Sequence, residues 1–221
     1  MEPLRSDANT RRLVFGIDPG TDCIGVCVID YETGDVLWAE ALKADRGVKE
    51  KEMTRKGGAG WRATRITSLC LAIRVNLEMV ALWPKEGDVI GYESPNAHHN
   101  SVRGLFQFVG AVVHELLAPV KGGGRRVLIH EINASTVKRE LGVTARDTAE
   151  MKMQMIARAR KESPIIEKKA VSYRGVVDAY KLTEAMCDAF GIAQTARVIE
   201  IKLTEGIKTN AYTKEANEVA S

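Results

Sequence analysis

The sequence has no long apolar run. No stretch of about 18 apolar residues occurs in its 221 residues, which excludes a membrane-spanning helix. The first twelve residues, MEPLRSDANTRR, lack the apolar segment of a secretory signal peptide. We therefore expect a protein without membrane association that works in the cytoplasm, either of a bacterium or of a phage-infected host.

Cysteine is also sparse, with four residues in the chain. Cys23 and Cys27 lie four residues apart on one predicted strand, whereas Cys70 and Cys187 fall on helical patterns. This spacing is not that of zinc-ligand pairs. We expect all four to act as small buried apolar side chains.

Neither sign of charge dominates the sequence: it has 32 basic and 29 acidic residues, and its net charge is only +3. The distribution is uneven, however. Between Lys43 and Arg65 eight basic residues accompany three acidic ones. Residues 44–60 are polar and contain glycine, so they predict a loop. From charge alone this loop is either an ordinary solvated segment or a surface for phosphates.

The remaining composition is that of a globular protein, with 45% hydrophobic and 28% charged residues. Neither a repeat nor a low-complexity segment is present. We expect a flexible segment at residues 1–12, one domain at 13–204 and a loose tail at 205–221.

Hydrophobic periodicity predicts the order of elements within that domain. Two strands form a hairpin at 13–30, and three more are expected at 35–43, 88–94 and 125–133. Helices are expected at 61–82, 101–117 (with Ser101 as cap), 135–141, 147–161 and 176–195. The order β-β-β-α-β-α-β-α is typical of an α/β ribonuclease H-like fold, in which a mixed five-stranded sheet carries helices on both faces.

Carboxylates stand at conspicuous places in this order. Asp18 ends the first strand before Pro-Gly, Glu93 ends the fourth, and Glu184 and Asp188 lie one turn apart on one face of the last helix. An ionised carboxylate at the end of a core strand needs a lysine, backbone amides or a metal. Singly, each has an ordinary structural explanation: a turn, a cap, or an ion pair with a residue such as Lys181.

Together, these carboxylates predict a metal site. Several carboxylates in one pocket repel each other unless a divalent cation neutralises them. Oxygen ligands suit Mg²⁺, with Mn²⁺ as a substitute. Two such ions about 4 Å apart catalyse phosphodiester hydrolysis.

Four segments then resemble, in order, the RuvC family of Holliday junction resolvases. They are GIDPGTDCIGVCVID, the helix pattern Leu105-x-Gln107-x-x-Gly110 after Glu93, LIHEIN leading into ASTVKRELG, and CDAFGIA at residues 187–193. The resemblance spans roughly residues 13–195. Its divergence and its long basic loop indicate a phage or plasmid version of the family.

The resemblance implies that Asp18, Glu93 and Asp188 are metal ligands. The family's fourth ligand falls three residues before the last aspartate, where this chain has Ala185. Glu184 is our substitute, and Asp178 is the alternative. Lys138, and with less support Lys152, resemble the family's basic residues near the scissile phosphate.

The resemblance also implies a DNA surface. His98 and His99 stand where the family often has an aromatic wedge, so they either stack on bases or form only a polar turn. Arg125 and Arg126 are further candidates for phosphate contacts. The predicted DNA-binding residues are Arg46, Lys49, Lys51, Arg55, Lys56, Arg62, His98, His99, Arg103, Lys138 and Lys152.

The function implied by the resemblance is that of a crossover junction endodeoxyribonuclease. A homodimer would cut four-way DNA by paired symmetric nicks, because the junction presents two equivalent strands. The catalytic set is Asp18, Glu93, Glu184, Asp188 and Lys138, with two Mg²⁺ ions per site. Binding would follow branched shape and phosphates rather than base edges.

Three alternatives remain at this point. Asp18-Pro19-Gly20-Thr21 matches the phosphate hairpin of actin-like ATPases and sugar kinases, which need a second such domain that this chain lacks. Alanine at 185 is compatible with a branched-DNA-binding module that has lost catalysis. A ribonuclease H-like enzyme acting on another substrate, such as an RNA–DNA hybrid, would use the same carboxylates.

Overall fold

The computed structural model describes residues 11–20, 23–43, 59–94, 102–117, 127–145 and 147–206, with the backbone alone for 59–65 and 102–108. Within this part of the chain, one sheet has the strand order β3-β2-β1-β4-β5. The strands are β1 (Leu13–Asp18), β2 (Cys23–Asp30), β3 (Val36–Lys43), β4 (Val89–Glu93) and β5 (Leu128–Ile132). β2 is antiparallel to both β1 and β3, whereas β1, β4 and β5 are parallel. The predicted mixed five-stranded sheet is confirmed.

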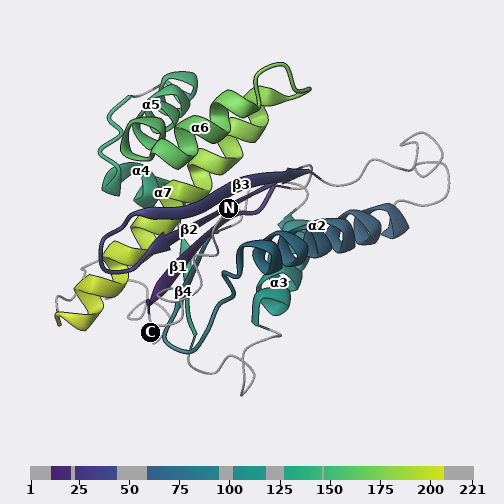
Figure 1. Ribbon diagram of the computed structural model, residues 1–221, viewed down its shortest axis with the longest axis horizontal. Helices are drawn as coiled ribbons and strands as arrows, with labels where there is room; N and C mark the ends of the chain where they lie inside the picture. Colours follow the sequence, from purple (N-terminus) through teal and green to yellow (C-terminus); the bar gives the residue numbers. More distant parts are fainter. Residues whose placement is uncertain are drawn as a thin grey trace, which may run out of the picture.

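Helices cover both faces of this sheet (Figure 1). One face carries α2 (Ala59–Val80) and α3 (Val102–Leu117). The other carries α4 (Ala134–Glu140), α5 (Thr148–Glu162), α6 (Pro164–Ser172) and α7 (Ala179–Thr204). Each face has its own apolar core, because alternate side chains of a strand point to opposite faces. Phe15 and Ile17 of β1 belong to the core beneath α2, and Val14 belongs to the core beneath α7.

Three glycines let α7 lie very close to the sheet. A Cβ on Gly25 would come within 1.9 Å of the Ala185 carbonyl oxygen, and one on Gly16 within 2.1 Å of the Ala189 oxygen. On β4, a Cβ on Gly91 would meet a methyl group of α7 at 2.8 Å. Glycine inside a strand commonly marks such a close backbone approach. These contacts fix the height of α7 above β1, β2 and β4.

The structure adds one helix that the sequence reading missed and moves the ends of another. α6 begins after Ser163, whose side-chain oxygen accepts a hydrogen bond from the Ile166 amide, and Pro164 occupies its first turn. This Ser-Pro pair is a helix start rather than a break. α7 begins at Ala179 and continues to Thr204, so the predicted limits of 176 and 195 were wrong at both ends.

A polar network joins the start of β1 to the end of α7. The Arg12 guanidinium donates to Glu200 at 2.9 Å and to the Gly87 carbonyl, and it stacks over the Tyr31 ring. Glu200 also contacts His130 of β5 at 3.2 Å. These partly buried contacts pin the edge of the sheet opposite to the ends of β1 and β4.

The four cysteines are buried or half-buried. Cys27 and Cys187 are buried in the core beneath α7, and Cys23 and Cys70 are half-buried. Burial raises the pKa of the Cys187 thiol to about 12.

In the described part of the chain, the helices are too short or too polar to cross a membrane.

Candidate active site

Two of the predicted carboxylates lie side by side where parallel strands end. β1 and β4 run in register, with Ile17 opposite Tyr92, so the next residues are Asp18 and Glu93. Gly16 on β1 and Gly91 on β4 face α7. Asp18 and Glu93 each come two residues later, so they lie on the same face of the sheet. The sheet therefore presents two acidic side chains at one edge, under the same helix.

α7 brings the other two carboxylates to this edge. Glu184 and Asp188 are one turn apart, and the helix between them rests on the sheet through Ala185 and Ala189. Because Gly25 and Gly16 carry no side chains, the helix backbone touches the strands directly at this point. Packing, rather than a loop, thus sets the position of the acidic face of α7.

Electrostatic coupling shows that the four carboxylates share one environment. Burial raises the pKa of Asp18 well above its usual value, and the charges of Asp188, Glu93 and Glu184 raise it further. Burial and the charges of Glu184 and Glu93 raise the pKa of Asp188 to about 7. Burial also raises the pKa of Glu93. Such clustering of mutually repelling acids is typical of functional sites.

Two lysines from other helices partly compensate this charge. Lys152 of α5 forms an ion pair with Glu184, and the hydrogen bond to Glu184 raises the pKa of Lys152. The positive charge of Lys152 also acts on Asp18, and it acts together with that of Lys138 of α4 on Glu93 and Asp188. The site so formed holds four acids and two bases, and we call it the carboxylate cluster.

The donor chemistry of the carboxylate cluster fits a hard divalent cation. All four acidic side chains offer oxygen, the atom type that Mg²⁺ prefers. Burial with mutual repulsion is the situation that a bound cation relieves. In the described residues, however, no three acidic, histidine or cysteine side chains already converge into a metal-binding group. A cation would therefore draw the carboxylates together, and Glu184 would have to share or leave Lys152.

Asp178, the alternative fourth ligand, has a different neighbour. It is the residue before α7, with a left-handed backbone (φ 64°), and its carboxylate lies 3.2 Å from Lys43 Nζ at the end of β3. The charges that act on Asp18 and Asp188 come from Glu93, Glu184, Lys138 and Lys152. The structure thus groups Glu184, not Asp178, with the other three acids.

Most of the predicted DNA-contacting residues lie outside the described residues. These are Arg46, Lys49, Lys51, Arg55, Lys56, His98, His99, Arg125 and Arg126. Arg62 and Arg103 lie on α2 and α3, where only the backbone is described. Of that predicted surface, Lys138 and Lys152 have described side chains, and both lie at the carboxylate cluster.

Sequence reasoning missed the residues that position the cluster. Gly16, Gly25 and Gly91 do no chemistry, but they determine how near α7 comes to the ends of the strands. A signal was available, because glycine in the middle of an otherwise apolar, β-branched strand indicates close backbone approach.

Comparison with known proteins gives matches in structure only. No protein-family model matches the sequence, and no curated protein matches it. The structure of Thermus thermophilus RuvC superposes with a TM-score of 0.52 at 18% identity, covering 86% of this chain and 96% of that one. T. thermophilus RuvC in complex with a Holliday junction substrate superposes less closely, with a TM-score of 0.47 at 19% identity and the same coverage. The fold expected from the order of elements is thereby confirmed, and the chain has the ribonuclease H-like fold of T. thermophilus RuvC.

Proposed function

We propose that this protein belongs to the RuvC family and is a Mg²⁺-dependent endonuclease that nicks four-way DNA junctions. The observation that carries the proposal is the carboxylate cluster: four acids from β1, β4 and α7 lie within electrostatic reach of one another at one sheet edge, beside two lysines. The fold shared with T. thermophilus RuvC supports the proposal. Fold alone would not suffice, because one fold supports many functions.

Asp18, Glu93, Glu184 and Asp188 would hold the ions, with Mn²⁺ able to replace Mg²⁺. A pair of divalent ions supplies the Lewis acid that phosphodiester hydrolysis requires. The protein's own residues do the rest. The four carboxylates concentrate negative charge at one point, and Asp188, with a pKa of about 7, gives up its proton readily when a cation arrives. Lys138 and Lys152 put positive charge beside the acids, where a DNA phosphate needs it.

Lys152 has a second part in this proposal. In the absence of DNA and metal it neutralises Glu184. Lysine has a long, flexible side chain, and that of Lys152 is 44% exposed, so it could turn to a phosphate oxygen if Glu184 bound a cation. Lys152 would then exchange the carboxylate of Glu184 for a phosphate as its anionic partner.

The substrate and the assembly are further parts of the proposal. A RuvC structure contains a Holliday junction substrate, and such a junction has two equivalent strands to cut. A dimer with twofold symmetry presents two clusters to those strands. The basic segment around residues 44–60 would supply phosphate contacts, which makes binding depend on salt.

The test compares the wild type with Asp18→Asn, Glu184→Gln and Asp178→Asn on a labelled four-way junction and on linear duplex. Each is assayed in Mg²⁺, Mn²⁺ and EDTA. We expect paired symmetric nicks from the wild type with either metal and none in EDTA. Asp18→Asn and Glu184→Gln should bind the junction without nicking it. Asp178→Asn is the matched control, because its carboxylate pairs with Lys43, and it should nick normally.

A second candidate is a junction-binding module without catalysis. Two observations favour it. Position 185, where the family's fourth ligand falls, is alanine, and Glu184 already forms an ion pair with Lys152. Tight junction binding by the wild type without nicks in either metal would establish this reading. Failure to prefer the junction over linear duplex would refute both.

A further inference from the structure

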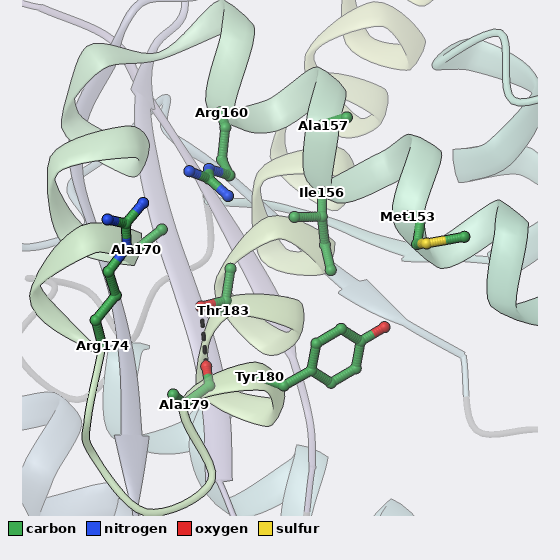
Figure 2. Close-up of a pocket in the computed structure, with 9 residues that line it drawn as sticks. All are labelled: Met153, Ile156, Ala157, Arg160, Ala170, Arg174, Ala179, Tyr180 and Thr183. Atoms are coloured by element: carbon green, nitrogen blue, oxygen red, sulfur yellow. Dashed lines mark hydrogen bonds between the residues drawn. The ribbon is translucent and has the colours of Figure 1, made fainter.

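A groove of about 410 Å³ opens between α5, α6 and α7 (Figure 2). Met153 and Ile156 come from α5, Ala170 from α6, and Tyr180 and Thr183 from α7. Its volume lies in the range of roughly 300–1,000 Å³ that is typical of small-ligand sites. Apolar side chains that remain exposed line it: Met153 is 58% exposed and Tyr180 is 55% exposed.

The two ends of the groove differ in chemistry. At one end Arg160 and Arg174 project toward each other, and at the other the Tyr180 ring lies on the side of Met153, with Ile156 between the two ends (Figure 2). Two of the nine lining residues are arginines and none is acidic. Arg160 forms an ion pair with Glu167 of α6, with Nη2 2.9 Å from Oε1, and the charge of Arg174 also acts on Glu167. The arginine end therefore keeps a net positive charge.

The groove and the carboxylate cluster are neighbours through single residues. Thr183 lines the groove and precedes Glu184 of the cluster. Met153 lines the groove and follows Lys152, and Tyr180 is near enough to Lys152 to raise its pKa. Tyr180 also lies one helical turn before Glu184, on the same side of α7. A ligand at the Tyr180 end of the groove would thus lie next to Glu184 and Lys152 of the cluster.

An aromatic ring, an apolar floor and a positive end are together the features that bind a nucleotide. Bases stack on exposed aromatic rings, and arginine binds the phosphates on either side. The surroundings agree with an anionic ligand, since residues 151–184 contain eight basic and four acidic side chains. An acidic peptide would suit the arginines but not the aromatic and apolar walls.

We propose that this groove binds one unpaired nucleotide of the DNA strand next to the scissile phosphate, with its base on Tyr180 and its phosphate at Arg174. The inference rests on the proposed nuclease function for the source of the nucleotide. A base held here gives the enzyme a means of preferring some sequences at the cut, which phosphate contacts alone do not provide.

The test measures binding of fluorescein-labelled single-stranded (dT)12 by anisotropy over a series of salt concentrations. The variants are Tyr180→Phe, Tyr180→Leu, Arg174→Ala and, as control, Lys168→Ala, an exposed lysine of α6 that does not line the groove. Tyr180 and Arg174 are both exposed, so these replacements leave the core intact. A Tyr180→Trp variant reports the location by its extra quenching relative to the wild type, whose three native tryptophans supply the background, because a base stacked on the new indole quenches its fluorescence.

We expect Tyr180→Leu to weaken (dT)12 binding about tenfold, as loss of one stacked base does, and Tyr180→Phe to bind like the wild type. Arg174→Ala should weaken binding and reduce the salt slope by about 0.7, the value for one phosphate contact to a single strand. Lys168→Ala should change affinity less than Arg174→Ala. Tyr180→Trp should be quenched by (dT)12 more than the wild type is, with its three native tryptophans.

Equal binding by Tyr180→Leu and the wild type, or no quenching of Tyr180→Trp beyond that of the wild type, would overturn the inference. So would a wild type with no affinity for (dT)12. If these results hold as expected but the wild type never nicks a four-way junction, the proposed nuclease function fails and the nucleotide site stands. The two proposals are therefore tested separately.

Discussion

Replacing Asp188 by asparagine should stabilise the metal-free protein even as it abolishes the proposed nicking. Asp188 is partly buried on α7, within reach of the negative charges of Glu184 and Glu93. At pH 8 its carboxylate must ionise in that setting. Asparagine has nearly the same shape but no charge, so it removes the repulsion and leaves the packing of α7 on the sheet unchanged.

The size of the effect follows from the pKa. Burial and its acidic neighbours raise the pKa of Asp188 from 3.8 to about 7. A rise of about three pKa units corresponds to about 4 kcal/mol, at roughly 1.36 kcal/mol per unit. That value is an upper limit. When Asp188 ionises, a neighbouring acid can take up the proton and Lys152 can shift toward the new charge, and both changes reduce the repulsion. We expect a gain of about 2 kcal/mol, which raises the melting temperature of a domain of this size by about 4–8 °C.

The pH dependence has a definite sign. The folded-state pKa lies above the unfolded-state value, so between about pH 4 and pH 7 the folded protein binds more protons than the unfolded chain. This group therefore makes the free energy of unfolding fall as pH rises through that range. The destabilisation is complete above pH 7 and is relieved on acidification. Asp188→Asn should flatten this part of the profile.

The assay is thermal unfolding in EDTA at pH 5 and pH 8, repeated with Mg²⁺. Wild type should melt higher at pH 5 than at pH 8, and Mg²⁺ should raise its melting temperature at pH 8. Asp178→Asn is the control, because its carboxylate pairs with Lys43 and its loss should not stabilise the protein. An Asp188→Asn variant that melts at or below the wild-type temperature at pH 8 in EDTA would refute the repulsion argument.

Two other substitutions test the same structure. Lys152→Met should lower metal-free stability by about 1 kcal/mol at pH 8, a modest amount because the side chain is 44% exposed, and Mg²⁺ should restore part of it, as melting curves would show. Ser163→Ala should cost about 1 kcal/mol in urea unfolding, since a buried cap of α6 is lost, whereas exposed Ser172→Ala, at the other end of that helix, should cost less than half as much.

The sheet could be predicted from the sequence because its signals are local. The β1 sequence LVFGID is an apolar run that ends in a carboxylate, and the Pro-Gly that follows turns the chain into β2. The sequence also indicates that Asp18 ends the first strand and Glu93 the fourth, and the parallel pairing of β1 and β4 brings these two strand ends together. That inference needed only the period of a strand and the order of the elements.

The rest depended on contacts between distant parts of the chain. Nothing near Lys152 in the sequence indicates that it pairs with Glu184, 32 positions later, because that contact requires α5 to pack against α7. The choice between Glu184 and Asp178 is of the same kind. Both were possible from spacing, and the position of Lys43 at the end of β3 separates them.

The close approach of α7 to the sheet leads to a last prediction, on Gly25→Ala. The added Cβ would lie 1.9 Å from the Ala185 carbonyl oxygen, and because that atom is backbone, the helix itself must move. Overpacking of this kind costs about 1–3 kcal/mol. Ala185 lies between Glu184 and Asp188, so the movement lifts both acids from Asp18.

Two measurements distinguish this displacement from ordinary destabilisation. Gly25→Ala should lose stability in urea, and it should also lose most of the Mg²⁺-dependent rise in melting temperature. Gly110→Ala is the matched control, because a Cβ there meets nothing within 4 Å and alanine favours a helix interior by up to about 1 kcal/mol. If Gly25→Ala keeps the wild-type response to Mg²⁺, the acids do not depend on the height of α7, and the glycine contacts serve stability alone.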